Sequence, residues 1–287
     1  HLYQCHASQK SRDRHNQCVA PYSNSKLPIT IWLLIESENM EEIAVVTGAS
    51  SGIGAATARA LAKSGYRVIA AARRVDLLES LATYSNLITP FELDVTEQES
   101  VDKLQKELTG KPVAILINNA GGAFDAESVL ESDPQIWSKT YDVNVVGAVR
   151  VTKAIAPIMK SLGKGHIVII SSTAGYIAYE NGGSYVAAKH GDVALARTLR
   201  LELAGDPIRV TEIAPGMVKT DEFAKNRFGG DKEKAEKIYQ GVDKPLTAED
   251  VAEAIRWSVT LPDHFNIDTM VIRPIAQAAQ HKVIRKS

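Results

Sequence analysis

A tyrosine and a lysine spaced one helical turn apart, Tyr185 and Lys189, are the residues of this chain best suited to proton transfer. The stretch that begins Tyr185-Val-Ala-Ala-Lys189 reads as a long helix, so both side chains emerge on one face. A cation beside a phenol favours the phenolate and lowers the tyrosine pKa from its usual ~10 toward neutral pH. Such a tyrosine can act as a general acid or base toward an alcohol or a carbonyl.

A hydroxyl group that could hold a substrate oxygen precedes the tyrosine by 13 positions. The apolar run 166–170 predicts a buried strand, and it is followed by two serines, Ser171 and Ser172. A serine at the end of such a strand can donate a hydrogen bond to a carbonyl or alcohol oxygen. Both serines remain candidates at this point.

A glycine-rich segment, Thr47-Gly-Ala-Ser-Ser-Gly-Ile-Gly54, lies upstream of these residues. It follows the short apolar run 42–46 and precedes a helix-like stretch, so the order is strand, glycine turn and helix. Glycines there let the backbone approach a pyrophosphate, whose charge is met by amide N–H groups at the helix N-terminus. The segment therefore predicts a dinucleotide site. The expected contacts are Gly48, Ser50, Ser51, Gly52, Ile53 and Gly54.

Two arginines, Arg73 and Arg74, indicate which dinucleotide is bound. They follow the strand-like run 66–72, where NAD enzymes place an acidic residue that accepts a hydrogen bond from the ribose 2′-hydroxyl. Asp76 is set back into the next helix, so no acid occupies that position. A guanidinium pairs well with a 2′-phosphate through bidentate hydrogen bonds. The sequence therefore predicts NADP rather than NAD, the alternative being that the arginines are merely solvated.

Three further motifs complete the pattern. Asn118-Asn-Ala-Gly121 follows the apolar run 113–117, and Asn144 lies in the segment 142–147. Pro215-Gly-Met-Val-Lys-Thr220 follows the strand-like run 208–214. In this order along the chain, the motifs resemble those of the short-chain dehydrogenase/reductase family. The resemblance covers about residues 40–275.

The resemblance implies a role for each residue of the set. Tyr185 is the general acid/base, Lys189 lowers its pKa and holds the ribose hydroxyls, and Asn144 anchors a water that links the lysine to solvent. The family spacing to the tyrosine favours Ser172 over Ser171 as the group that positions the substrate carbonyl. The other cofactor contacts that the family implies are Asp94, Val95, Asn118, Ala120, Gly121, Pro215, Gly216, Val218 and Thr220.

Apolar strand-like runs alternate with amphipathic stretches, which predicts an α/β protein with a parallel sheet. We expect a single-domain, doubly wound Rossmann fold over residues 40–287, with helices on both faces and a lid at about 216–241. Seven strands are expected, near 43–47, 67–71, 87–91, 113–117, 166–171, 208–214 and 269–272.

Composition excludes several other classes. The net charge is −1 and the basic residues are dispersed along the chain, which argues against a nucleic-acid or membrane partner. No apolar run approaches the ~20 residues of a membrane span. The two cysteines indicate a reducing, cytoplasmic setting without disulfides.

Residues 1–39 are polar and aperiodic, and we interpret them as a leader or non-native extension. A transit peptide is one alternative. Zinc binding by Cys5, His6, His15 and Cys18 is another, but the spacing fits no common site, so no metal is expected.

The carboxy-terminal third suggests the substrate. It resembles the bacterial branch of the family that oxidises small 3-hydroxy acids. Arg227 in the lid is a candidate partner for a substrate carboxylate, with Lys219 and Lys225 as rivals.

A broad NADPH-dependent carbonyl or ketone reductase is the alternative enzyme. A non-catalytic dinucleotide-binding redox sensor is the alternative of another class, although such proteins lose the tyrosine, lysine or asparagine. The family also implies a homotetramer, formed through helices near 135–161 and 184–204.

Overall fold

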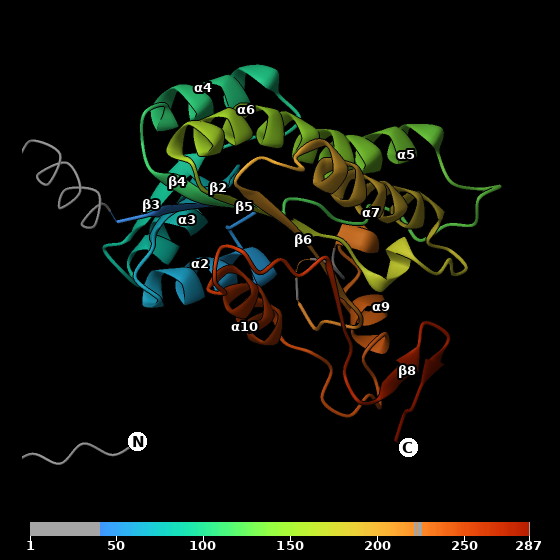
Figure 1. Ribbon diagram of the computed structural model, residues 1–287. Coiled ribbons are helices and arrows are strands. Elements are labelled where there is room, and N and C mark those ends of the chain that lie inside the picture. The colour runs from blue at the N-terminus through green and yellow to red at the C-terminus, as the bar shows by residue number, and fades with distance from the viewer. Residues whose placement is uncertain (1–40, 221, 223–225, 287) are drawn as a thin grey trace, which may run out of the picture. The chain divides into compact units, whose positions relative to one another are not determined.

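The computed structural model describes residues 41–220, 222 and 226–286. These residues form one seven-stranded parallel sheet with helices on both faces (Figure 1), which confirms the expected α/β Rossmann fold. The interpretation of residues 1–39, including the four zinc candidates, falls outside the described residues, as does Lys225.

The strands occur where the apolar runs predict them, and each end shifts by no more than one residue. Their order across the sheet is β3-β2-β1-β4-β5-β6-β7, so the chain reverses its direction of travel between β1 and β4. A ligand crevice is expected beyond the carboxyl ends of the strands at such a reversal. The strands are β1 (Ile43–Thr47), β2 (Arg67–Ala72), β3 (Ile88–Glu92), β4 (Val113–Asn118), β5 (Gly165–Ile170), β6 (Ile208–Pro215) and β7 (Thr269–Ile272).

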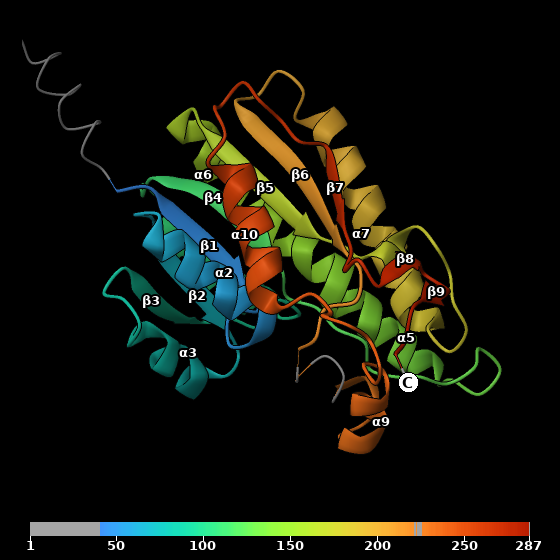
Figure 2. The same cartoon turned by 90° about the horizontal axis from the view of Figure 1, so that it is seen from below.

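Two hydrophobic layers hold the helices against the sheet. On one face lie α2 (Gly52–Lys63), α3 (Val75–Ala82) and α10 (Ala248–Val259). The other face is covered by α4 (Gln98–Leu108), α6 (Gly147–Leu162) and α7 (Gly183–Glu202), which lie together in Figure 1. Figure 2 looks onto the opposite face, with α2, α3 and α10 in front of the sheet.

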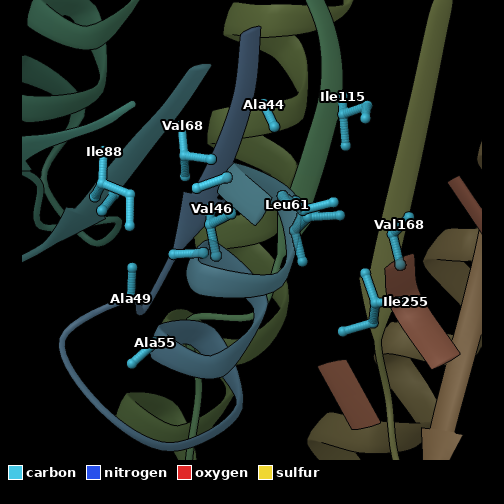
Figure 3. Close-up of a cluster of buried hydrophobic side chains, with 14 of the residues drawn as sticks. Ala44, Val46, Ala49, Ala55, Leu61, Val68, Ile88, Ile115, Val168 and Ile255 are labelled. Carbon is cyan, nitrogen blue, oxygen red and sulfur yellow. The ribbon is translucent and has the colours of Figure 1, made fainter. Parts of the chain in front are cut away.

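Small strand residues allow close packing in the first layer. Figure 3 shows Leu61 of α2 beside Val46 of β1, with Ile255 of α10 farther along the sheet. Leu61 and Ile255 are both fully buried. Removing such a side chain would cost about 2 to 5 kcal/mol.

The helix expected near 135–161 is interrupted, which corrects that prediction. It consists of α5 (Pro134–Tyr141), a π-helical turn η1 (Asp142–Val146) and then α6. Within η1, Asn144 Nδ2 donates to the carbonyl oxygen of Thr140, 2.7 Å away, and to that of Gly122, 2.9 Å away. An asparagine amide that competes for the helical carbonyl groups in this way accounts for the widened turn.

The end of the chain contacts the described part of the segment that we expect to form a lid. The short helix α9 (Lys232–Lys237) is followed by a loop, and the hairpin β8 (Gln277–Ala279) and β9 (Lys282–Val283) lies beyond β7. Arg285 donates to the carbonyl oxygens of Ile238 and Gln240, so the chain end holds the loop after α9. None of the helices in the described part of the chain is long and apolar enough to cross a membrane.

Candidate active site

A cavity of about 660 Å³ lies at the carboxyl ends of the strands. Residues from the glycine-rich turn, from the loops after β2 to β6 and from the lid form its walls. The sequence-predicted residues that line it are Gly48, Ser50, Ser51, Gly52, Ile53, Arg73, Arg74, Asp94, Val95, Ala120, Gly121, Ser172, Tyr185, Lys189, Pro215, Gly216, Val218, Thr220 and Arg227.

Two of the predicted cofactor residues, Gly54 and Asn118, are not among the residues that line the cavity, and both have structural contacts. A Cβ added at Gly54 would lie 2.3 Å from the carbonyl oxygen of Gly48, so this glycine is needed for α2 to pack on the turn. Asn118 is buried at the end of β4, where its Nδ2 donates to Thr152 Oγ1 over 3.0 Å. The next residue, Asn119, lines the cavity in its place. The sequence locates the motif, but only the strand geometry decides which asparagine faces the cavity.

Asn144 lies behind the cavity wall rather than on it. Its side chain is buried, and Oδ1 accepts a hydrogen bond from the backbone N–H of Gly122 over 3.1 Å. A Cβ at Gly121 would lie 2.3 Å from this oxygen and 3.7 Å from Lys189 Nζ. The asparagine thus fixes the loop after β4 close to the lysine, and the water that the family implies for it stays a prediction.

The two candidate serines have different surroundings. Ser171 is buried and its Oγ donates to Glu212 Oε1 over 2.5 Å. Ser172 Oγ accepts a hydrogen bond from the backbone N–H of Ala174 at 3.1 Å and donates a long one, 3.4 Å, to the carbonyl oxygen of Pro215. Both serines line the cavity, but the donor of Ser171 is held by a carboxylate, whereas the long bond of Ser172 can be exchanged for one to a substrate oxygen, so the geometry favours Ser172.

The proton-transfer pair lies on α7 beneath the cavity. Tyr185 is 8% exposed, and Lys189 Nζ lies 5.7 Å from the centroid of its ring. The ammonium donates to the carbonyl oxygen of Ile170 at 2.9 Å and to Asp192 Oδ2 at 2.8 Å. Burial acts to lower the pKa of Lys189, but the Asp192 carboxylate and the Tyr185 phenol together outweigh it and raise the pKa above its usual value. Lys189 therefore remains a cation beside the ring of Tyr185.

The glycine-rich turn, residues 48–53, lies against the cavity at the start of α2. Gly48 has a φ of 66° and Gly52 a φ of 53°, in the left-handed region that favours glycine. The first turn of α2, which is described in full, contains no acidic side chain. The positive end of the α2 dipole is therefore available to a pyrophosphate.

A guanidinium from the end of β2 lies over this turn. Arg74 Nη2 donates to Ser50 Oγ at 3.0 Å and to Ser51 Oγ at 2.8 Å, and Nη1 donates to Glu222 Oε2 at 2.9 Å. Arg73 is more exposed and makes a 3.9 Å ion pair with Asp94. Both arginines therefore border the region expected for an adenosine ribose. Glu222 comes from the lid, and sequence reasoning missed it because no motif contains it.

The lid contributes a second guanidinium at the other end of the cavity. Arg227 stacks over the rings of Tyr179, 5.2 Å from the centroid, and Phe228, 5.7 Å away. Its Nη2 donates to the carbonyl oxygen of Asn181, and its buried Nε has no hydrogen-bond partner among the described residues. Burial raises the pKa of Tyr179 to about 12, so this phenol stays neutral beside the guanidinium.

The carboxy-terminal hairpin adds two cavity residues that sequence reasoning missed. Gln277 Oε1 accepts a hydrogen bond from the backbone N–H of Met217, and Gln280 Oε1 accepts one from Thr173 Oγ1 at 2.8 Å. Both glutamines are far from the other site residues in sequence, and no local pattern marks them as part of a site.

Comparisons with known proteins agree with this geometry. A family model described as short chain dehydrogenase matches residues 42–229. An uncharacterized oxidoreductase of Mycobacterium tuberculosis is 47% identical over 239 residues, covering 83% of this chain and 93% of the relative. The NADP-dependent 3-hydroxy acid dehydrogenase YdfG of Escherichia coli (strain K12) is 38% identical over 240 residues, covering 82% of this chain and 96% of the relative.

Solved structures show the same similarity. The closed form of serine dehydrogenase complexed with NADP+ superposes with a TM-score of 0.80 at 36% identity, covering 85% of this chain and all of that one. A variant of actinorhodin polyketide ketoreductase with NADPH gives a TM-score of 0.72 at 30% identity, covering 81% of this chain and 95% of that one.

Proposed function

The chain belongs to the short-chain dehydrogenase family, and we propose that it catalyses reversible, NADP-dependent oxidation of a small 3-hydroxy acid. The broader activity is that of an NADP-dependent oxidoreductase acting on CH–OH groups. The substrate class is the part of the proposal that rests on the residues of this cavity.

NADP fits the residues at the cofactor end of the cavity. The N-terminus of α2 would receive the pyrophosphate, and Arg74 with Ser50 and Ser51 would meet the 2′-phosphate. A nicotinamide bound in this cavity supplies the hydride acceptor or donor. Pro215 and Thr220, which line the cavity after β6, would orient its carboxamide.

Three side chains of α7 and the loop after β5 would carry out the proton transfer. Ser172 would donate a hydrogen bond to the substrate oxygen, and the Tyr185 oxygen would take the hydroxyl proton during oxidation or return it during reduction. Lys189 favours the phenolate that accepts this proton. A general acid/base placed in this way contributes about 10²- to 10⁴-fold in rate.

Arg227 is the observation that supports an acidic substrate. It is half-buried in the lid wall of the cavity that also contains Tyr185, and its Nε has no partner among the described residues. A 3-hydroxy acid carries a carboxylate near its reacting carbon, and a guanidinium binds a carboxylate through two parallel hydrogen bonds. We propose that Arg227 holds this carboxylate while the lid, residues 216–241, closes over the substrate.

A substrate panel tests the proposal. Purified protein with NADP should oxidise serine, allo-threonine and 3-hydroxypropionate with a kcat/KM at least about tenfold above that for uncharged secondary alcohols of similar size, a difference of about 1.4 kcal/mol. A preference for the uncharged alcohols, or for ketones with NADPH, would support the alternative of a broad carbonyl reductase. The apolar cavity residues Phe124, Met217 and Ile238 are the observation that favours that alternative.

We also propose a homotetramer assembled through α5, α6 and α7. Tyr141 at the end of α5 is 45% exposed and Leu130, in the loop before it, is 97% exposed, which is unfavourable for large apolar side chains left in water. Light scattering coupled to size-exclusion chromatography would give the mass of four chains. A monomer mass at micromolar concentration would contradict this assembly.

A further inference from the structure

A buried carboxylate contacts the catalytic lysine. Asp192 lies three residues after Lys189 on α7, and its Oδ2 is 2.8 Å from the ammonium. The side chains of Lys189 and Asp192 are only 8% and 2% exposed, so water screens this pair little. The pair therefore influences the electrostatics of the site far more than a surface ion pair would.

A second buried acid lies behind Asp192. Glu212 on β6 is fully buried and accepts hydrogen bonds from Ser171, Tyr176 and Thr269. Its charge adds to the burial that raises the pKa of Asp192 to about 6, an effect that Lys189 opposes.

Other charged and titratable groups of the described residues lie near this cluster. Arg197 on α7 lies 5.7 Å from the ring of Tyr176. From the neighbouring α5, the hydroxyl of Tyr141 faces Gly191, 3.3 Å from the position that a Cβ there would take. On the cavity side the nearest titratable group is Tyr185, whose ring lies 5.7 Å from Lys189 Nζ.

Asp192 also decides where the ammonium points. An ammonium has three N–H donors, and in Lys189 one goes to Asp192 and one to the carbonyl oxygen of Ile170. A third N–H can then point toward the cavity that Lys189 lines. The carboxylate thus fixes both the position and the charge of the lysine.

We infer that Asp192 is a positioning residue that holds Lys189 and sets the pH at which Tyr185 exchanges its proton. This inference rests on Tyr185 being the proton-transferring group of the proposed function. A buried negative charge stabilises the protonated forms of its neighbours, the ammonium and the neutral phenol alike. Its removal therefore lowers the pH at which Tyr185 loses its proton, because Lys189, whose ordinary pKa is 10.5, stays charged on the acid limb and continues to attract the phenolate.

Asp192→Asn tests this inference because it removes the charge and keeps a hydrogen-bond acceptor. The acid limb of kcat/KM for alcohol oxidation should move down by about one pH unit, so that the rate at a fixed pH on that limb rises about tenfold. The same shift should occur in an ultraviolet titration of the phenolate in protein free of substrate and cofactor, with Tyr185→Phe used to identify the Tyr185 signal. The spectroscopic result does not depend on which substrate the enzyme uses.

Two comparisons make the test specific. Glu202→Gln removes a charge from an exposed position of the same helix and should leave both titrations unchanged. Asp192→Ser also accepts a hydrogen bond without carrying charge, and it should reproduce the shift. Unchanged titrations in folded Asp192→Asn would overturn the inference. Loss of the fold in both Asp192 variants would assign the carboxylate to stability alone and would overturn it too.

Discussion

Arg74 and Glu222 join the glycine-rich turn to the lid through an ion pair of 2.9 Å between Nη1 and Oε2. The same guanidinium donates to Ser50 and Ser51 at the start of α2. The group expected to bind the 2′-phosphate of NADP is therefore already in contact with a carboxylate from the lid. Phosphate and Glu222 would compete for one cation, so the lid contact and the cofactor preference are linked.

Glu222→Gln should tighten NADP binding because it removes the competing negative charge. The pair is more than a third exposed, so screening reduces its strength and we expect about a three- to fivefold decrease in Kd, less than 1 kcal/mol. NAD, which lacks the phosphate, should bind unchanged. Isothermal titration of both cofactors measures this, and equal changes for the two would contradict the competition.

Arg74→Ala should weaken NADP binding by about 10- to 100-fold and leave NAD binding nearly unchanged, since hydrogen bonds to charged groups contribute about 1.5 to 3 kcal/mol. Arg73→Ala should have a smaller effect, because that side chain is more exposed and pairs with Asp94. Fluorescence titration with NADPH and NADH distinguishes the two arginines. If the Arg74 variant lost both cofactors equally, the arginine would support the turn rather than the 2′-phosphate.

Tyr185→Phe should leave NADPH binding within about twofold of wild type while reducing kcat by at least about 10²-fold, because only the proton-transferring oxygen is removed. Single-turnover kinetics at saturating cofactor measure the chemical step directly. More than a tenth of the wild-type rate would exclude Tyr185 as the general acid/base. The isosteric loss of one hydroxyl keeps the effect separate from changes in packing.

The sequence predicts this fold well because the central strands β1, β4 and β5 are buried on both faces and read as nearly continuous apolar runs. It predicts less about side chains whose roles depend on distant partners. The π-helical turn follows from the contact between Asn144 and the loop at Gly122. Asn119 rather than Asn118 lines the cavity because neighbouring side chains at the end of a strand point in opposite directions. Glu222 joins the site only through the path of the lid, which no local pattern specifies.

His166 should make stability depend on pH. It is buried on β5 with Nε2 2.8 Å from Thr211 Oγ1, and burial lowers its pKa to about 3 from an ordinary value of 6.5, with Arg209 adding to the effect. Below pH 6.5 the unfolded chain binds a proton that the folded protein does not, so stability decreases as pH falls. The loss from this residue should be about 2 kcal/mol between pH 7 and pH 5.

Urea unfolding of His166→Gln at the two pH values measures this contribution. The variant should lose about 2 kcal/mol less than wild type on acidification. His190→Gln is the matched control, because His190 is exposed on α7, and it should keep the wild-type loss. An identical pH dependence in the wild type and in His166→Gln would show that His166 does not stay neutral in the folded protein.

Arg227→Ala should distinguish acidic from neutral substrates. The guanidinium lies against Tyr179 and is held by the carbonyl oxygen of Asn181, in the cavity that contains the proton-transfer groups. If it binds the substrate carboxylate, its loss should raise KM for a 3-hydroxy acid at least about tenfold, or 1.4 kcal/mol, and change KM for an uncharged secondary alcohol by less than about twofold. Arg227→Lys keeps the charge without the planar pair of donors and should recover only part of the affinity. Lys219→Ala, which removes one of the two rival cations, should leave both KM values unchanged. Equal losses for acidic and neutral substrates in Arg227→Ala would instead assign the arginine to closure of the lid, and the broad carbonyl reductase would become the better description of the enzyme.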